Sequence, residues 1–226
     1  MKREEVLNRI EEVGVIAAIR LDSEEDAAFA GEAVYRGGIP VIEIPMTLAR
    51  APEVISQLLR RNPDLVVGAG GVSNAKMAQT CLDAGAQFLT SDGLHLARVE
   101  LGARKGAVIF PGALTPSEII TAWESGCDFV KIVPCAQIGG EAYIRSVHAM
   151  YPEIPLIAAG GVDQQTASKY ILAGAVAVGV GRELIPAGAV RHRQEQRIHE
   201  LARRFVGFVK GAREGRLPKR EGPYVG

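Results

Sequence analysis

The sequence predicts a single (β/α)8 barrel, the TIM-barrel fold, with an extra N-terminal helix. Short runs of strand-forming residues recur eight times along the 226 residues, and each run is followed by a segment with helical spacing. The repeat of roughly 20 to 27 residues suits one strand, one helix and two loops. The runs are also continuously apolar, which indicates strands covered on both faces, as in a parallel sheet wrapped by helices.

The elements can be assigned in order along one domain, residues 1–226. Residues 1–13 are expected to form an amphipathic helix, residues 192–213 the last helix, and residues 214–226 a C-terminal tail. The eight strand runs end at Arg20, Pro45, Gly70, Asp92, Gly112, Pro134, Gly160 and Gly181.

Capping residues mark the boundaries of several helices. Ser73, Thr115 and Asp163 are expected to be N-caps, and Thr115 is followed by Pro116 and Glu118, as in a capping box. Several helices end in a small residue and a glycine, which favours a left-handed stop. An open doubly wound sheet is the alternative fold, but no G-x-G-x-x-G motif follows the first strand run.

The composition indicates a cytoplasmic protein with a small partner. Lysine and arginine (26) balance aspartate and glutamate (26), so no net field attracts nucleic acid or an anionic membrane. The three cysteines form no C-x-x-C pair, which suits a reducing compartment, and metal-ligand spacing is absent, so we expect no metal. The longest apolar run, 172–181, is too short to cross a bilayer.

Lys131 is the most informative polar residue, because it lies inside the apolar run DFVKIVP, residues 128–134. Strand alternation places it on the same face as Phe129 and Val133. If this face points into the barrel, burial disfavours the ammonium and leaves more of the neutral amine, which attacks ketones. Lys131 is therefore a candidate nucleophile.

Glu43 is a second charged residue in an apolar run, IPVIEIP, residues 39–45. A carboxylate at the mouth of a barrel can take and return protons. Together the two residues suggest Schiff-base chemistry, in which Lys131 forms an iminium with a 2-keto acid and Glu43 moves protons while a C–C bond breaks. The alternative is a buried Lys131–Glu43 ion pair that only links two strands.

Other residues at the strand ends are candidates for binding an anionic substrate. Arg20, which closes the first run, can hold a carboxylate in bidentate fashion or simply be solvated. The loops after the last two strands are the usual phosphate site of such barrels, and a helix start near Asp163 would add its positive dipole. The candidates in these loops are Gly160, Gly161, Gly179, Gly181 and Arg182.

Six motifs occur in order on the expected strands and the loops that follow them. They are E-I-P, VGAGGV, FPGALTPSEI, DFVKIVP, AAGGV and VGVG, within residues 15–186. Their order resembles the 2-keto-3-deoxy-6-phosphogluconate (KDPG) and 4-hydroxy-2-oxoglutarate (KHG) aldolase family, which includes 2-keto-3-deoxy-6-phosphogalactonate aldolases. The most specific parts are P-G-x-x-T-P-S-E and the strand lysine followed by proline three residues later.

The resemblance implies a (β/α)8 barrel, usually a homotrimer, that catalyses reversible class I aldol cleavage to pyruvate without a metal or other cofactor. Lys131 matches the family's Schiff-base lysine, and Glu43 matches its general acid and base. Arg20 matches an arginine of the galactonate-type branch. Glycines 160, 161 and 181 match the phosphate loops.

Several positions depart from the family pattern. Gly71 stands where members commonly have a threonine near the bound pyruvate moiety. Asp92 replaces the proline of S-P-G and brings a carboxylate toward the site, although it is best explained as the N-cap of the next helix. Pro45 and Thr47 replace the threonine and arginine of the gluconate-type E-V-T-x-R, and Arg182 replaces a serine.

The sequence thus predicts a lyase that cleaves a 2-keto-3-deoxy-6-phospho sugar acid, or KHG, reversibly to pyruvate and an aldehyde such as glyceraldehyde 3-phosphate. One alternative is a decarboxylase of oxaloacetate or another 2-keto acid that uses the same lysine. Others are a phosphosugar isomerase and a non-catalytic barrel that binds sugar phosphates. Neither nucleic acid nor a membrane is an expected partner.

Overall fold

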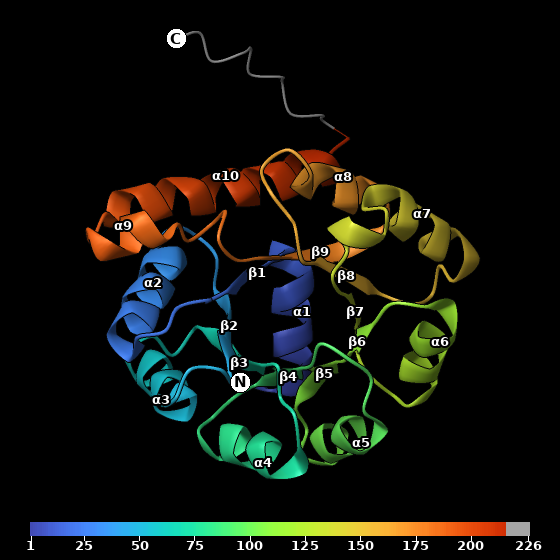
Figure 1. The fold of residues 1–226 in the computed structure, drawn as a ribbon, viewed down its shortest axis with the longest axis horizontal. Helices are drawn as coiled ribbons and strands as arrows, with labels where there is room; N and C mark the ends of the chain where they lie inside the picture. The colour runs from blue at the N-terminus through green and yellow to red at the C-terminus, as the bar shows by residue number, and fades with distance from the viewer. Residues whose placement is uncertain (216–226) are drawn as a thin grey trace, which may run out of the picture.

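The protein folds as a ring of parallel strands surrounded by helices, which confirms the predicted barrel (Figure 1). The structure is a computed structural model that describes residues 1–215, so the expected tail lies outside the described residues from position 216. The strands are β1 (Val15–Ala18), β2 (Val41–Pro45), β3 (Val66–Gly70), β4 (Phe88–Thr90), β5 (Val108–Phe110), β6 (Gly112–Ala113), β7 (Val130–Ile132), β8 (Leu156–Ala159) and β9 (Ala175–Val180). The α-helices are α1 (Arg3–Val13), α2 (Glu24–Arg36), α3 (Ala51–Arg61), α4 (Ala75–Asp83), α5 (Leu96–Arg104), α6 (Pro116–Glu124), α7 (Glu141–Met150), α8 (Ala167–Leu172), α9 (Ala187–Arg191) and α10 (Glu195–Arg213).

The ring closes through one interrupted strand. Hydrogen-bonded neighbours follow the order β5-β4-β3-β2-β1-β9-β8-β7-β6. Only Pro111 separates β5 from β6, and proline has no amide hydrogen for a sheet bond. The amides of Asp128 and Lys131 donate to the carbonyls of Ile109 and Pro111, both at 2.9 Å, so this segment joins the two ends of the ring. The predicted strand ending at Gly112 is therefore two short strands in one barrel position.

The predicted helix starts are right in part. Thr115 caps α6 as predicted, because Glu118 accepts from the Thr115 amide at 2.8 Å and Thr115 Oγ1 accepts from the Glu118 amide at 3.3 Å. The N-cap of α4 is Asn74 rather than Ser73, since the Asn74 side chain accepts from the amide of the third helical residue. The predicted last helix is α10 alone, with the short α9 before it. Within residues 1–215, every helix is too short or too polar to cross a membrane.

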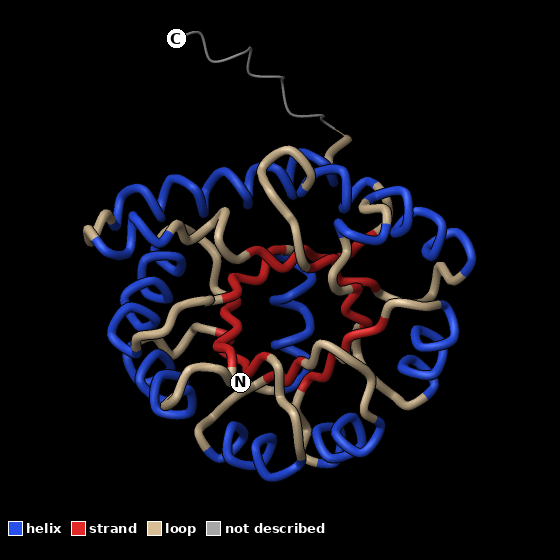
Figure 2. Tube along the Cα trace, viewed as in Figure 1, coloured by secondary structure: helices blue, strands red, loops and turns tan. Residues whose placement is uncertain are grey.

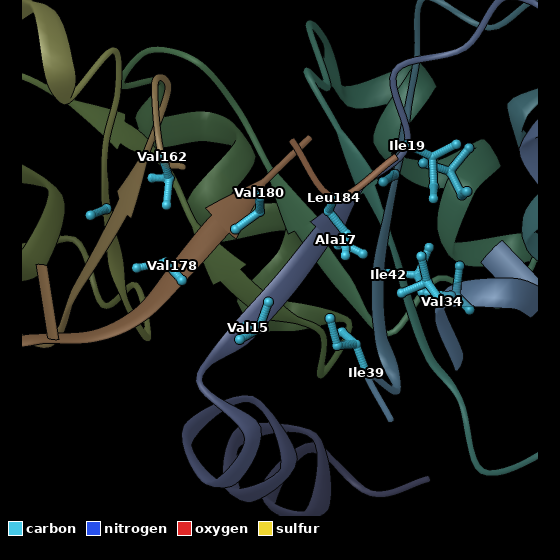
Figure 3. Close-up of a cluster of buried hydrophobic side chains, with 14 of the residues drawn as sticks. Val15, Ala17, Ile19, Val34, Ile39, Ile42, Val162, Val178, Val180 and Leu184 are labelled. Carbon is cyan, nitrogen blue, oxygen red and sulfur yellow. The ribbon is translucent and has the colours of Figure 1, made fainter. Parts of the chain in front are cut away.

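Most of the apolar core lies between the strands and the surrounding helices. Val15 and Ala17 of β1 face this layer and are fully buried, as is Ile19 just beyond the strand. Figure 3 shows these side chains alongside Val34 of α2 and Val178 of β9. The alternate residues of β1 consequently point into the barrel.

Apolar side chains fill the amino-terminal end of the barrel interior. Helix α1, which is seen through the ring of strands in Figure 2, places Val6 and Ile10 in an apolar cluster with the rings of Phe88, Phe110 and Phe129. The centroids of the first two rings are 4.9 Å apart, and those of the last two are 6.0 Å apart. Because hydrocarbon fills this end, inward-facing polar side chains collect at the carboxyl ends of the strands.

Truncating one of these rings should destabilise the barrel strongly. Phe88 is fully buried, and its ring occupies the space that a side chain on Gly68 would need, 2.2 Å from a Cβ built there. We expect Phe88→Ala to lower the free energy of unfolding by about 3–5 kcal/mol, measured by urea denaturation, because a cavity remains. Phe208→Ala, on the half-buried side of α10, is the matched control and should cost less. Equal losses would contradict the assigned core.

Candidate active site

A cavity of about 430 Å³ opens at the carboxyl ends of the strands. Its apolar lining includes Ile16, Phe110 and Ile157, which continue the core from below. Lys131 and Glu43 are the charged residues set among these hydrocarbon groups, and both are buried. The cavity therefore combines an apolar floor with two ionisable side chains, a combination common in ligand sites.

Lys131 lies at the centre of β7, opposite Gly112 of β6 and Ile157 of β8. It is only 3% exposed, so its amine is shielded from bulk water as the sequence predicted. The Nζ atom donates to Thr90 Oγ1 at 3.2 Å and to Asp92 Oδ1 at 2.9 Å. Because an ammonium has three hydrogens, one remains for a group bound in the cavity.

Glu43 lies in β2 and is 7% exposed. Its Oε2 accepts a hydrogen bond from Thr90 Oγ1 at 2.9 Å. The other oxygen, Oε1, occupies the space beside Gly70, where a built Cβ would lie 2.4 Å away. Gly70 thus leaves room for the Glu43 carboxylate at the floor of the mouth.

The direct Lys131–Glu43 ion pair, kept open as a structural alternative, does not form among the described residues. Instead Thr90 lies between the two groups, and the carboxylate paired with Lys131 is that of Asp92. The prediction that Asp92 caps the next helix is wrong, because α5 begins at Leu96. The Asp92 side chain is instead 61% exposed and lines a smaller cavity beside the main one.

The position of Asp92 depends on a close approach of two backbones. A Cβ on Gly112 would lie 2.5 Å from the Asp92 carbonyl carbon, so only glycine admits this contact. Partial desolvation acts to raise the pKa of Asp92, but the charge and hydrogen bond of Lys131, with a weaker effect of Arg20, bring it below its ordinary value of 3.8. Asp92 is therefore an ionised partner of the Lys131 ammonium.

Arg20 lies beyond the end of β1 and is exposed. It borders both the main cavity and a neighbouring one of about 250 Å³, and Glu43 also borders both. Within residues 1–215 its guanidinium makes no hydrogen bond or ion pair, which leaves its donors available for a carboxylate. Gly71 lines the smaller cavity in a left-handed conformation (φ 69°), with nothing within 4 Å of a built Cβ.

The loops after β8 and β9 form the far wall of the main cavity. The residues that the sequence assigned to an anion site all line it: Gly160, Gly161, Gly179, Gly181 and Arg182. A Cβ on Gly161 would lie 2.4 Å from Ala136 Cβ, and one on Gly160 would lie 2.9 Å from Pro134 Cα, so neither position accepts a side chain. Within the described chain, the amides of Gly161 and Arg182 donate to no backbone carbonyl.

The sequence predicted that a helix starting at Asp163 would add its positive dipole to the anion site, and this helix start is not found. Helix α8 begins after Thr166, and the Asp163 carboxylate accepts from the amides of Gln165 and Thr166 at 2.9 and 2.8 Å. These amides are therefore already used by the protein. An anion in this part of the cavity would depend on the glycine loops and on Arg182, with Glu183 as an opposing charge at the rim.

The described residues support neither a cysteine nucleophile nor a metal centre. Burial raises the pKa of the Cys135 thiol to about 11, so this residue is a buried filler, as predicted, rather than a thiolate nucleophile. Among the residues that the structure describes, no three His, Cys, Asp or Glu side chains lie together in a metal-binding group.

Thr90 and Gly70 are the site residues that sequence reasoning missed. Both could have been found from strand alternation, which puts Phe88, Thr90 and Asp92 on one face of their strand run, and Gly70 on the inner face of β3. Threonine and glycine are both common at strand ends, so only their positions in the strand alternation could have indicated that these two residues belong to the site.

Comparison with known proteins identifies the family of the chain. The sequence model of the KDPG and KHG aldolase family matches residues 6–201. A 2-dehydro-3-deoxy-phosphogluconate aldolase of Pseudoalteromonas atlantica is 28% identical over 197 residues, which cover 87% of this chain and 92% of that protein. A 2-dehydro-3-deoxy-6-phosphogalactonate aldolase of Escherichia coli is 28% identical over 202 residues, 88% of this chain and 95% of the relative.

A solved structure has the same fold and a bound reaction intermediate. It is the KDPG aldolase of Legionella pneumophila with pyruvate captured at low pH as a covalent carbinolamine, and it superposes with a TM-score of 0.81 at 25% identity. The superposition covers 88% of this chain and 96% of the other. With a family match over most of its length, this chain belongs to the KDPG and KHG aldolase family and is an aldolase, which is a lyase.

Proposed function

We propose that the protein is a class I aldolase that cleaves a 2-keto-3-deoxy-6-phospho sugar acid, or KHG, reversibly to pyruvate and an aldehyde. The observation that carries this proposal is the buried Lys131 amine, which borders the main cavity and is linked through one hydroxyl to the buried Glu43 carboxylate. A pure binding protein has no need to bury either group, because each costs desolvation free energy.

Each residue has a distinct role in the proposed reaction. Lys131 attacks the C2 carbonyl and forms the iminium, which withdraws electrons from the bond between C3 and C4. Glu43 takes the proton of the C4 hydroxyl as that bond breaks, and later returns a proton to C3 of the resulting enamine. Water then hydrolyses the iminium to release pyruvate and regenerate the lysine.

The two ends of the substrate would be held by the two walls of the cavity. Arg20, which is exposed and makes no hydrogen bond or ion pair within residues 1–215, would hold the carboxylate beside the smaller cavity, which Gly71 leaves open. Gly160, Gly161, Gly179, Gly181 and Arg182 would hold the phosphate through backbone amides and one guanidinium. Both relatives are named as aldolases of phosphorylated sugar acids, which supports an anion at this wall.

Two further proposals rest on the family resemblance and on cysteine usage. We propose that the chain assembles as a homotrimer, as the resemblance implies. We also propose a reducing, cytoplasmic environment, which agrees with three buried cysteines that form no disulfide, Cys81, Cys127 and Cys135.

Pyruvate and borohydride should attach a permanent three-carbon adduct to Lys131. The iminium is reduced to a secondary amine, which mass spectrometry of the intact protein and its peptides detects. Lys131→Ala should abolish both the adduct and pyruvate release from KDPG, its galactonate counterpart and KHG. Lys131→Arg keeps the positive charge as a matched control and should also be inactive. An unmodified wild-type protein, or turnover of oxaloacetate alone, would contradict the aldolase proposal.

Removing the charge of Glu43 should slow C–C cleavage and leave the final amount of the Lys131 adduct nearly unchanged. We expect Glu43→Gln to lower kcat for C–C cleavage by about 10²–10⁴-fold, because proton transfer at C4 and C3 loses its acceptor. The final extent of pyruvate trapping at Lys131 should stay near that of the wild type. Glu53→Gln, at an exposed position of helix α3, is the matched control and should leave both measurements unchanged. A wild-type kcat for Glu43→Gln would exclude the assigned role.

Removing the charge of Asp92 should change how the stability of the protein depends on pH. In Asp92→Asn the Lys131 side chain loses its ionised partner. Because the folded pKa of Asp92 is lowered, its stabilising effect is present above pH 3.8 and disappears as the pH falls through the folded value. Unfolding curves should therefore differ between variant and wild type at neutral pH and converge in acid. Unfolding curves that coincide at neutral pH would contradict the ion pair.

A further inference from the structure

Thr90 connects the two ionisable groups of the site. It closes β4, is 2% exposed, and its Oγ1 lies 3.2 Å from Lys131 Nζ and 2.9 Å from Glu43 Oε2. A hydroxyl has one donor hydrogen and two acceptor positions. The Lys131 ammonium can only donate, and an ionised Glu43 can only accept. The Thr90 hydroxyl therefore accepts from Lys131 and donates to Glu43. The hydrogen bonds therefore run in one direction, from nitrogen to carboxylate.

The hydroxyl is held firmly in this position. Thr90 is opposite Phe110 in the register between β4 and β5, and its carbonyl accepts from the Val72 amide at 3.0 Å. A β-branched side chain has few χ1 rotamers in such a strand. Burying a hydroxyl also costs free energy unless it is fully bonded, and here both of its bonds go to the groups that we assign to the chemistry.

We propose that Thr90 is a proton relay, which carries protons from the Lys131 nitrogen to Glu43 while the Schiff base forms. This inference rests on the aldolase function proposed above. In each transfer, Thr90 Oγ1 takes a proton from the nitrogen as it gives its own hydrogen to the carboxylate. The hydroxyl is thus unchanged at the end of the transfer, and no other reactant is needed.

The relay operates twice in the formation of one iminium. The first transfer converts the ammonium to the amine and protonates Glu43. As the nitrogen forms its bond to C2, Glu43 gives this proton to the carbonyl oxygen. The second transfer removes a proton from the now positive nitrogen, and Glu43 delivers it to the hydroxyl, which leaves as water when the C–O bond breaks. Two protons leave the nitrogen and two arrive on the oxygen, so atoms and charge balance.

The remaining charged groups near the amine do not offer the same route. Asp92 accepts a hydrogen bond from Lys131, but its side chain is largely exposed and its pKa is below the ordinary value, so it stays ionised as a counter-ion. Arg20 is a cation at the rim and cannot accept a proton. Glu43 is a buried acceptor, and the Thr90 hydroxyl connects it to Lys131 by two hydrogen bonds.

The test compares Thr90→Val with Thr90→Ser. Valine has nearly the same shape as threonine without the hydroxyl, whereas serine keeps the hydroxyl. The rate of iminium formation is measured by mixing each protein with pyruvate and quenching with borohydride after increasing times. We expect Thr90→Val to slow iminium formation by about 10²-fold or more, and Thr90→Ser to remain within several-fold of the wild type. The midpoint of urea denaturation shows whether each variant is folded, and Thr90→Ala replaces the valine variant if it is not.

The solvent isotope effect separates a relay from a residue that only positions Lys131. In deuterium oxide the wild type and Thr90→Ser should show the same slowing of iminium formation, and Thr90→Val should show a different isotope effect, because its protons move by another route. A wild-type rate in Thr90→Val, or an equal loss in Thr90→Ser, would overturn the relay and leave the aldolase proposal intact. Failure to trap pyruvate on the wild type would overturn both.

Discussion

The structure depends on the burial of one amine in the centre of a hydrocarbon barrel. Lys131 is opposite a glycine and an isoleucine in the sheet. Within the described residues, its ammonium donates to the Thr90 hydroxyl of β4 and pairs with the Asp92 carboxylate in the loop after it. A buried ammonium without such partners would destabilise the fold by several kcal/mol, on the order of the total stability of a domain. The positions of Thr90, Asp92 and Glu43 are best understood as consequences of this constraint.

Glycines, which have no side chain, make this arrangement possible as much as the polar groups do. Gly70 leaves the space that the Glu43 carboxylate occupies, and Gly112 lets the backbone at Asp92 approach the barrel closely enough for its carboxylate to reach Lys131. Gly161 and its neighbour do the same at the opposite wall, where two loops pass within contact of each other. The cavity is therefore shaped by glycines in three separate strand-end segments, and each is fixed by a different backbone contact.

Much of the fold and part of the candidate site can be predicted from the sequence. Eight apolar runs at a regular spacing predict the barrel, and a charge inside an apolar run identifies Lys131 and Glu43 as candidates without any alignment. The partner of Asp92 could not be predicted, because it depends on the tertiary contact at Gly112. Thr90 was missed for a related reason: threonine is an ordinary strand residue, and only the barrel shows which two groups its hydroxyl joins.

Helix α1 determines from which end of the barrel molecules can enter and leave. Val6 and Ile10 close the amino-terminal end, so entry and departure share the mouth above Lys131. In the proposed reaction, a keto acid bonded to that amine would lie over this closed end, with its carboxylate toward Arg20 at the rim. For the proposed reaction the aldehyde must depart before water can reach the remaining three carbons, and in synthesis the pyruvate must load first. Both products would thus leave through one opening because of an N-terminal helix whose residues do not line the cavity.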